Sequence, residues 1–366
     1  MTDIKSTVKV CLGAFGITIV ALAVGACATP AYSPAAVEAR NELVAAHLAA
    51  TDGGEVTAAP RRAIEDRILA LDPDRISDDD VRNALAAGPT PRIVLVHGGI
   101  AGVYVMMESF GKFLVGMGYP ETRIRDPRNG EWSQNPYGSS KRLAGELAWY
   151  YERDAVRPML IGHSQGGIQV VKILHEFAGT FGPERRVFNP LTRQLEDRTT
   201  IVDPLTGRER PVVGVSVASA SVVGAGGWSL VLPVHWKVFP VIRSIPDTVD
   251  DFTGYRIGLD FFAWDAPGLE GVKTFHAVGK ANVRNVTLPA EYSHVFVPDT
   301  ESLALSAPMR AWINAFDPDN IAALAPLPDE NASNVMWAAD VWHTVKKHWC
   351  LEAQRLLRAR RAALGR

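Results

Sequence analysis

The stretch Gly162-His163-Ser164-Gln165-Gly166 constrains the fold of this chain more than any other. Residues 157–161 before it form a short apolar run, and residues 167–174 after it have a helical pattern. A strand-to-helix turn this tight requires small residues two positions before and two positions after the serine. The serine hydroxyl then stands clear of the sheet, at the N-terminus of the helix. We therefore interpret Ser164 as a candidate nucleophile at the end of a buried strand.

Strand and helix patterns alternate along the rest of the chain. The uninterrupted apolar run 92–96 is typical of a strand that is buried on both faces of a parallel sheet. Further strands are expected at 122–125, 212–218, 257–264 and 283–288, with helices at 106–117 and 137–154. This alternation predicts an α/β fold, with a mostly parallel sheet of about six strands flanked by helices.

Two segments interrupt the alternation. Residues 183–211 contain two similar turns around 198–202, which predict a hairpin excursion. Residues 224–254 form the second interruption, and its first part, 224–246, is rich in Trp, Phe and Leu. This composition suits either a lid-like insertion over an apolar substrate or an ordinary piece of core, and both interpretations stay open.

The N-terminus has the features of a secretory signal. Lys5 and Lys9 precede the apolar run 10–24, which is shorter than the roughly 20 residues that a spanning helix prefers. The following Val24-Gly25-Ala26-Cys27 resembles a bacterial lipobox, which implies removal of residues 1–26 and lipidation of Cys27. By the same resemblance, Ala28 favours the outer membrane of the bacterial cell envelope. An uncleaved membrane anchor and a signal cut elsewhere are the alternatives.

We expect three parts after the signal. Residues 27–90 are interpreted as a tether with helices near 38–50, 61–71 and 78–87, the last of them capped by Ser77. Residues 91–331 contain the alternating pattern and form the expected main domain. Residues 332–366 predict a basic C-terminal helix, which either docks on this domain or lies on a membrane surface.

A serine hydroxyl needs a base within hydrogen-bond reach, and the base needs a third group to orient it. Of the nine histidines, His294 has the best position, because it lies beyond the last expected strand. The other histidines considered lie in glycine turns (His97 and His163), the insertion (His235), an expected buried element (His276) or the C-terminal helix (His343 and His348). We therefore predict that His294 is the base.

The orienting acid is expected between Ser164 and His294 in chain order, at the end of a strand. Asp265 is favoured, because it follows the expected strand 257–264 and begins a loop. Asp260 is the alternative, although it falls inside that expected strand. Glu291 lies close to His294 in sequence and would serve only through an unusual loop path.

Negative charge develops on a carbonyl oxygen when a nucleophile attacks it, and backbone N–H groups can stabilise this charge. Gln165 offers one such group directly after Ser164, at the helix N-terminus. Gly99 follows His97-Gly98 at the end of the first strand and is placed to offer a second. We therefore predict an oxyanion site made of Gly99 and Gln165.

Together these motifs resemble the α/β-hydrolase fold, in its lipase/esterase branch. The matching pieces are Val94-Leu95-Val96-His97-Gly98-Gly99, Ile161-Gly162-His163-Ser164-Gln165-Gly166-Gly167 and Tyr292-Ser293-His294, within residues 92–300. The resemblance implies a triad of Ser164, an acid and His294, and a serine hydrolase that cleaves carboxylic esters through an acyl-enzyme. The chain departs from the family pattern in two respects, since the acid lacks a clear signature and no antiparallel hairpin is evident before Arg92.

Composition limits the partners. A net charge of −2 gives no reason to expect nucleic acid. Of the three cysteines, Cys350 alone lies in the expected folded part, so neither an internal disulfide nor a metal-type cysteine pair is expected, and no cofactor is implied. The expected partners are an ester or lipid-like substrate and, through the anchor, a membrane, whereas the oligomeric state stays open. The alternative functions are a catalytically silent envelope binding protein, a thioesterase, amidase or acyltransferase, and a structural anchor built on the C-terminal helix.

Overall fold

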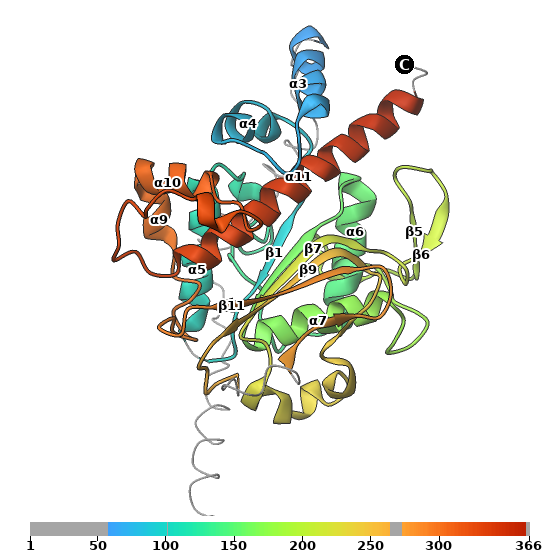
Figure 1. The fold of residues 1–366 in the computed structure, drawn as a ribbon. Coiled ribbons are helices and arrows are strands. Elements are labelled where there is room, and N and C mark those ends of the chain that lie inside the picture. The colour runs from blue at the N-terminus through green and yellow to red at the C-terminus, as the bar shows by residue number, and fades with distance from the viewer. Residues whose placement is uncertain (1–57, 101, 264–272, 364–366) are drawn as a thin grey trace, which may run out of the picture.

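The computed structural model describes residues 58–363, except Ala101 and residues 264–272. Its centre is a five-stranded parallel sheet in the order β1-β2-β7-β9-β11 (Figure 1). The strands are β1 (Ile93–Val96), β2 (Met159–His163), β7 (Val217–Val223), β9 (Val249–Ile257) and β11 (Asn282–Leu288). The α/β class is confirmed, and the described part of the main sheet has five strands in place of about six.

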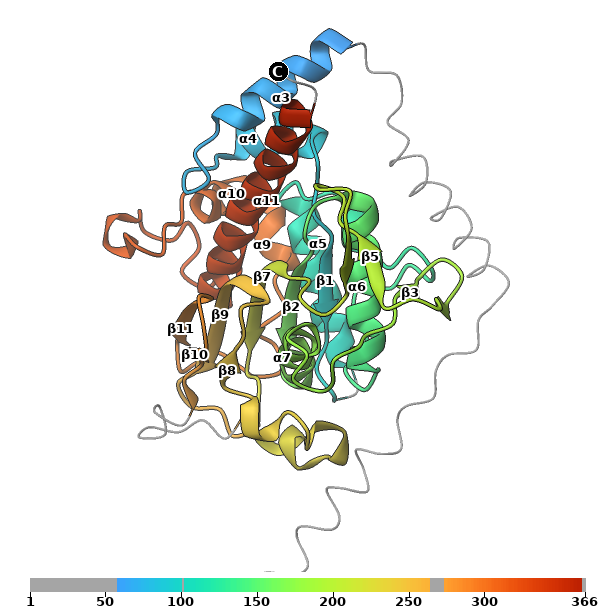
Figure 2. The same cartoon turned by 90° about the vertical axis from the view of Figure 1, so that its right-hand side faces the viewer.

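Helices cover both faces of the sheet (Figure 2). One apolar cluster packs α5 (Val103–Gly116) and α11 (Val335–Ala363) on one face, and a second packs α6 (Ser140–Asp154) and α7 (Gln165–Phe177) on the other. The first cluster also contains residues of the shorter helices α3 (Ala58–Ala70), α4 (Asp78–Asn83), α9 (Glu301–Leu305) and α10 (Ala307–Asn314). The helices before β1 and after β11 therefore share one core with the sheet.

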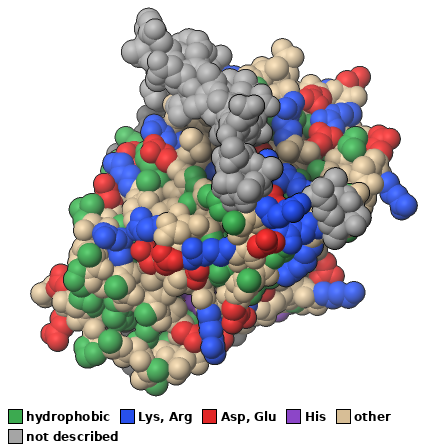
Figure 3. Space-filling view, turned by 90° about the horizontal axis from the view of Figure 1, so that it is seen from above, with side chains coloured by type: hydrophobic (Ala, Val, Ile, Leu, Met, Phe, Trp, Pro, Cys, Tyr) green, Lys and Arg blue, Asp and Glu red, His purple; other side chains and the backbone are tan. Residues whose placement is uncertain are grey.

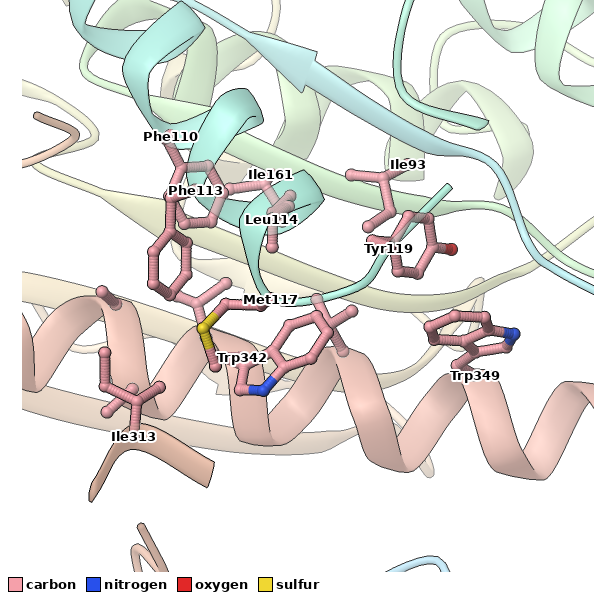
Figure 4. Packing of buried hydrophobic residues seen from close by; sticks show 14 of the residues in the cluster. Ile93, Phe110, Phe113, Leu114, Met117, Tyr119, Ile161, Ile313, Trp342 and Trp349 are labelled. Atoms are coloured by element: carbon pink, nitrogen blue, oxygen red, sulfur yellow. The ribbon is translucent and has the colours of Figure 1, made fainter. Parts of the chain in front are cut away.

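Helix α11 is docked along its length. Trp337, Trp342 and Trp349 are fully buried, and Figure 4 shows Trp342 and Trp349 facing aromatic and apolar residues of α5 and the loop after it. At the other end of the chain, Ser77 caps α4 as predicted, in a capping box with Asp80. Short 3-10 helices complete the elements on this side of the molecule: η1 (Leu85–Ala87), η2 (Glu121–Arg123) and η6 (Ile321–Ala323).

Three of the expected strands are corrected by the structure. The expected strand 122–125 is wrong, because η2 occupies this position as one helical turn. The strand expected at 212–218 begins only at Val217. The strand expected at 257–264 ends where it was predicted to begin, since β9 runs from Val249 to Ile257. The first residues of β9 include Asp250 and Asp251. Because acidic residues are rare in strands, the sequence did not indicate a strand here, although its later residues are buried.

The excursion and residues 224–248 of the insertion lie outside the main sheet, whereas the predicted end of the insertion at 254 is wrong, because β9 begins at Val249. The excursion contains two hairpins, β3 (Phe188–Asn189) with β4 (Gln194–Leu195) and β5 (Thr200–Val202) with β6 (Glu209–Pro211), joined by the predicted turns. The insertion after β7 consists of η3 (Gly227–Val231), η4 (Pro233–His235) and η5 (Phe239–Val241). It ends in β8 (Ser244–Ile245), which pairs in parallel with β10 (His276–Ala277). His276 is exposed, so its expected burial is wrong.

Candidate active site

Ser164 lies on a strained turn between β2 and α7. Its backbone has a φ of 54° and a ψ of −121°, a conformation that non-glycine residues rarely adopt. A Cβ on Gly162 would lie 2.6 Å from the Gly166 carbonyl oxygen, and a Cβ on Gly166 would overlap the carbonyl oxygens of Val96 and His97. These close backbone contacts explain why positions 162 and 166 need small residues, as predicted.

His294 connects Ser164 to a carboxylate. The Ser164 hydroxyl lies 2.9 Å from His294 Nε2, and His294 Nδ1 lies 2.6 Å from Asp260 Oδ2. An ionised carboxylate only accepts hydrogen bonds, so Nδ1 donates to Asp260 and the lone pair of Nε2 accepts from Ser164. All three residues are buried, with 8%, 7% and 2% of Ser164, His294 and Asp260 exposed. This arrangement can take the proton of the serine hydroxyl as the oxygen attacks an electrophile.

Asp260, the alternative to the favoured Asp265, is the carboxylate that contacts His294 in the described part of the chain. The imidazole has one Nδ1–H, and Asp260 accepts it, while the other oxygen of Asp260 accepts from the backbone N–H of Ala263 at 3.0 Å. Asp265 itself lies outside the described residues. Glu291 is exposed on the loop before His294. The correction follows from the shift of β9, because a strand that ends at Ile257 leaves Asp260 in the loop beyond it.

The site collects residues from the carboxyl ends of all five strands. Gly98 and Gly99 follow β1, Ser164 follows β2, Gly224 follows β7, Asp260 follows β9 and His294 follows β11. Parallel strands place these ends at one edge of the sheet, so side chains far apart in the sequence meet there. The topology thus explains how residues between positions 98 and 294 form one site.

Gly224 and Phe262 hold the imidazole of His294 from two sides. Gly224 has a φ of 62°, and a Cβ there would lie 2.7 Å from His294 Cε1. The ring of Phe262 stacks on the imidazole, with 5.3 Å between their centroids. Neither residue was predicted, because nothing in the sequence near them indicates contact with a histidine that is 32 or more positions away.

His163 also supports His294, a role that the sequence analysis missed. His163 Nε2 donates to the backbone carbonyl of His294 at 2.7 Å, which ties the base loop to the nucleophile turn. Burial, and to a smaller extent the neighbouring His294, lowers the pKa of His163 to about 3. His163 is therefore neutral at physiological pH, so it adds no positive charge beside the base.

The two predicted oxyanion donors lie beside the nucleophile. Gln165 is the first residue of α7, so its N–H has no intrahelical acceptor and points out of the helix end. A Cβ on Gly98 would lie 3.2 Å from Ser164 Cβ, and one on Gly99 would overlap the Gln165 side chain. The Tyr137 hydroxyl donates to the Gly99 carbonyl at 3.0 Å and so fixes this loop from the far side. Negative charge beside Ser164 would meet the N-terminus of α7.

Several other predictions concern residues away from this site. Cys27 lies outside the described residues. None of the described helices is both long and apolar enough to span a membrane. In the described part of the chain, no group of three or more His, Cys, Asp and Glu side chains is arranged to hold a metal ion. Cys350 is a buried free thiol on α11, and burial raises its pKa to about 12.

No protein-family model matches the chain, and a search of curated proteins finds no matching sequence.

Proposed function

We propose that this protein is a serine hydrolase of carboxylic esters, with an α/β-hydrolase fold, that works through an acyl-enzyme intermediate. The observation that carries the proposal is the chain of contacts from Ser164 Oγ through both nitrogens of His294 to Asp260, at 2.9 and 2.6 Å. A buried Ser–His–Asp chain at the carboxyl edge of a parallel sheet activates a hydroxyl, which a purely structural site does not require.

The reaction would proceed in two stages. Ser164 Oγ attacks the ester carbonyl while its proton moves to His294 Nε2, and Asp260 stabilises the resulting imidazolium. The N–H groups of Gln165 and Gly99 donate to the oxyanion, and each such donor typically contributes about 3–4 kcal/mol to the transition state. His294 then protonates the departing alcohol. In the second stage, His294 takes a proton from water, and the hydroxide formed adds to the acyl carbonyl. The bond to Ser164 Oγ then breaks, His294 returns the proton to Oγ, and the carboxylic acid leaves.

The cellular location is part of the proposal. The lipobox-like Val24-Gly25-Ala26-Cys27 supports a bacterial lipoprotein that is anchored through Cys27 in the cell envelope, at the outer membrane. An anchored enzyme of this kind would meet esters at or near a lipid surface. The insertion at 224–245 borders the site through Gly224, which supports a role for it in contacting the substrate. Mass spectrometry of the mature N-terminus tests the anchor directly, because an unmodified Cys27 would contradict it.

Hydrolysis of p-nitrophenyl esters of increasing chain length tests the proposed activity. We expect saturable turnover by the wild-type protein, and a loss of several orders of magnitude in kcat for Ser164→Ala and His294→Ala. Because Ser164→Ala removes one hydroxyl group and leaves the Cβ in place, the variant should unfold at nearly the same denaturant concentration as the wild type. Absence of turnover on every chain length, with a folded wild-type protein, would favour the silent binding protein instead.

A further inference from the structure

The exposed hydrophobic side chains of the protein gather around the candidate active site. Of 17 large hydrophobic residues that are exposed in the described part of the chain, 12 lie on segments that adjoin site residues. These segments are 104–105 with Ile100, beyond Gly99; 228–239, in the insertion; 259–262, around Asp260; and Phe296, after His294. We call these 12 side chains the apolar rim. Phe261, Leu259 and Trp236 are its most exposed members, at 73%, 67% and 63%.

The apolar rim is nearly free of charge. Its segments contain two charged residues, Lys237 and Asp260, and Asp260 is buried against His294. At the opposite end of the molecule, seen from above in Figure 3, many Lys, Arg, Asp and Glu side chains lie among the hydrophobic ones. Apolar exposure concentrated on one face of a soluble fold marks a contact surface, whereas single exposed hydrophobic residues do not.

The rim is continuous with the site itself. Aromatic rings lead from the insertion to the base, with centroid distances of 6.0 Å from Trp228 to Phe261, 6.3 Å from Phe261 to Phe262 and 5.3 Å from Phe262 to His294. A surface that covers the rim therefore also faces the entrance to Ser164.

We propose that the apolar rim docks on the surface of a phospholipid bilayer, so that Ser164 faces the lipid. Tryptophan and phenylalanine side chains suit the boundary between headgroups and acyl chains, the one acidic residue on the rim segments is buried, and Lys237 suits anionic headgroups. The bilayer would then be a binding partner of the proposed hydrolase, and the anchored protein would be oriented with its active site toward the lipid.

The tether length permits this orientation. The insertion lies at the end of the molecule opposite α3, as both Figure 1 and Figure 2 show, so the chain enters the fold far from the rim. Thirty residues, 28–57, separate Cys27 from Ala58. With the expected helix at 38–50 they reach about 75 Å, whereas a folded body of this size has a radius of gyration of about 20 Å. An anchor at Cys27 can therefore share one bilayer with the rim. This step rests on the proposed anchor, whereas the docking of the rim does not.

Site-specific fluorescence tests the docking. The full-length protein, processed as in the cell, is reconstituted into vesicles of phosphatidylethanolamine and phosphatidylglycerol. Phe261→Cys carries an environment-sensitive fluorophore, and Leu305→Cys is the matched control, since Leu305 is 77% exposed and lies outside the rim. Both variants also carry Ser164→Ala, so the lipids stay intact and the result does not depend on hydrolysis. Thermal unfolding checks that both labelled proteins are folded.

We expect the probe at 261 to shift to the blue on vesicles and to be quenched by lipids that are brominated in their acyl chains. The probe at 305 should keep its aqueous emission. Identical aqueous emission from both probes would overturn the proposal, and so would a protein that does not float with the vesicles. The emission at 261 could instead shift to the blue as the protein-to-lipid ratio rises, without quenching by brominated lipids. That result would mean that the rim binds a second copy of the chain, and it would also overturn the proposal.

Discussion

At the scale of single residues, Asp260 is the most informative part of the site. Its two carboxylate oxygens have different partners, His294 Nδ1 at 2.6 Å and the Ala263 N–H at 3.0 Å, which fix the carboxylate in the orientation that the imidazole needs. The sequence supported a carboxylate in this region but favoured Asp265. The error arose because the aromatic run around Asp260 looks like a strand, whereas the actual strand begins with acidic residues.

We predict that Asp260→Asn lowers kcat about 10⁴-fold, because the amide holds His294 in the wrong tautomer for accepting the serine proton. Asp265→Asn should leave kcat within a few fold of the wild type. Steady-state hydrolysis of one short ester by both variants measures the difference. If Asp265→Asn were the damaging change, the assignment of the acid would be wrong.

Other residues of the site could be predicted only when they belong to a motif. Ser164, Gly99 and Gln165 stand in stretches whose spacing has a mechanical reason, and His294 follows the last strand. His163 lies inside the best motif, yet its bond to the His294 carbonyl depends on how the base loop folds back, which no local pattern indicates.

At the scale of elements, α11 shows how a basic helix can belong to the core. Its buried face carries Trp337, Trp342 and Trp349, and its charged residues pair with the body of the fold. Arg284 and Asp340 form an ion pair at 2.6 Å, and Arg157 and Glu352 form another at 2.7 Å. The sequence left docking and a membrane-surface position open, because helical spacing does not show what faces the apolar stripe. The structure confirms docking.

Two substitutions on α11 test whether its tryptophan face is docked in the core and its basic end is exposed. Trp342→Ala should lower the free energy of unfolding by about 3–5 kcal/mol, because it leaves a large cavity and removes the bond from the indole N–H to Asn314. Arg361→Ala removes a partly exposed ion pair with Asp66 and should cost about 1 kcal/mol or less. Denaturant unfolding measures both. Equal and small effects would contradict the docked position of α11.

At the scale of the whole molecule, the fold class was predictable because continuous apolar runs mark buried parallel strands. The order of those strands was not, since it depends on which helix crosses which face. The parallel direction brings five strand ends to one edge, and the order decides which of them are neighbours, so together they create both the site and the apolar rim. Each exposed residue looks ordinary in the sequence, and the rim exists only after folding.

Buried histidines should make the whole fold sensitive to acid. Burial lowers the pKa of His235 to about 4, and the charge of Lys172 acts in the same direction. Below the ordinary pKa of about 6.5, the unfolded chain therefore binds a proton that the folded chain excludes, so stability falls as pH decreases toward 4. Between pH 7 and pH 5, the free energy of unfolding should therefore fall by about 2 kcal/mol less in His235→Leu than in the wild type.

Denaturant unfolding at the two pH values measures this change. The exposed His276 provides the control, and His276→Gln should keep the pH dependence of the wild type. An unchanged pH dependence in His235→Leu would show that His235 accepts its proton in the folded protein.

Covalent labelling shows whether His294 and Asp260 activate Ser164. We predict that a fluorophosphonate forms one adduct on Ser164, located by peptide mass spectrometry, and that His294→Ala and Asp260→Asn strongly slow its formation. Ser164→Ala should not be labelled at all. A folded wild-type protein that stays unlabelled, or one labelled at the same rate after loss of His294, would show that His294 and Asp260 do not activate Ser164.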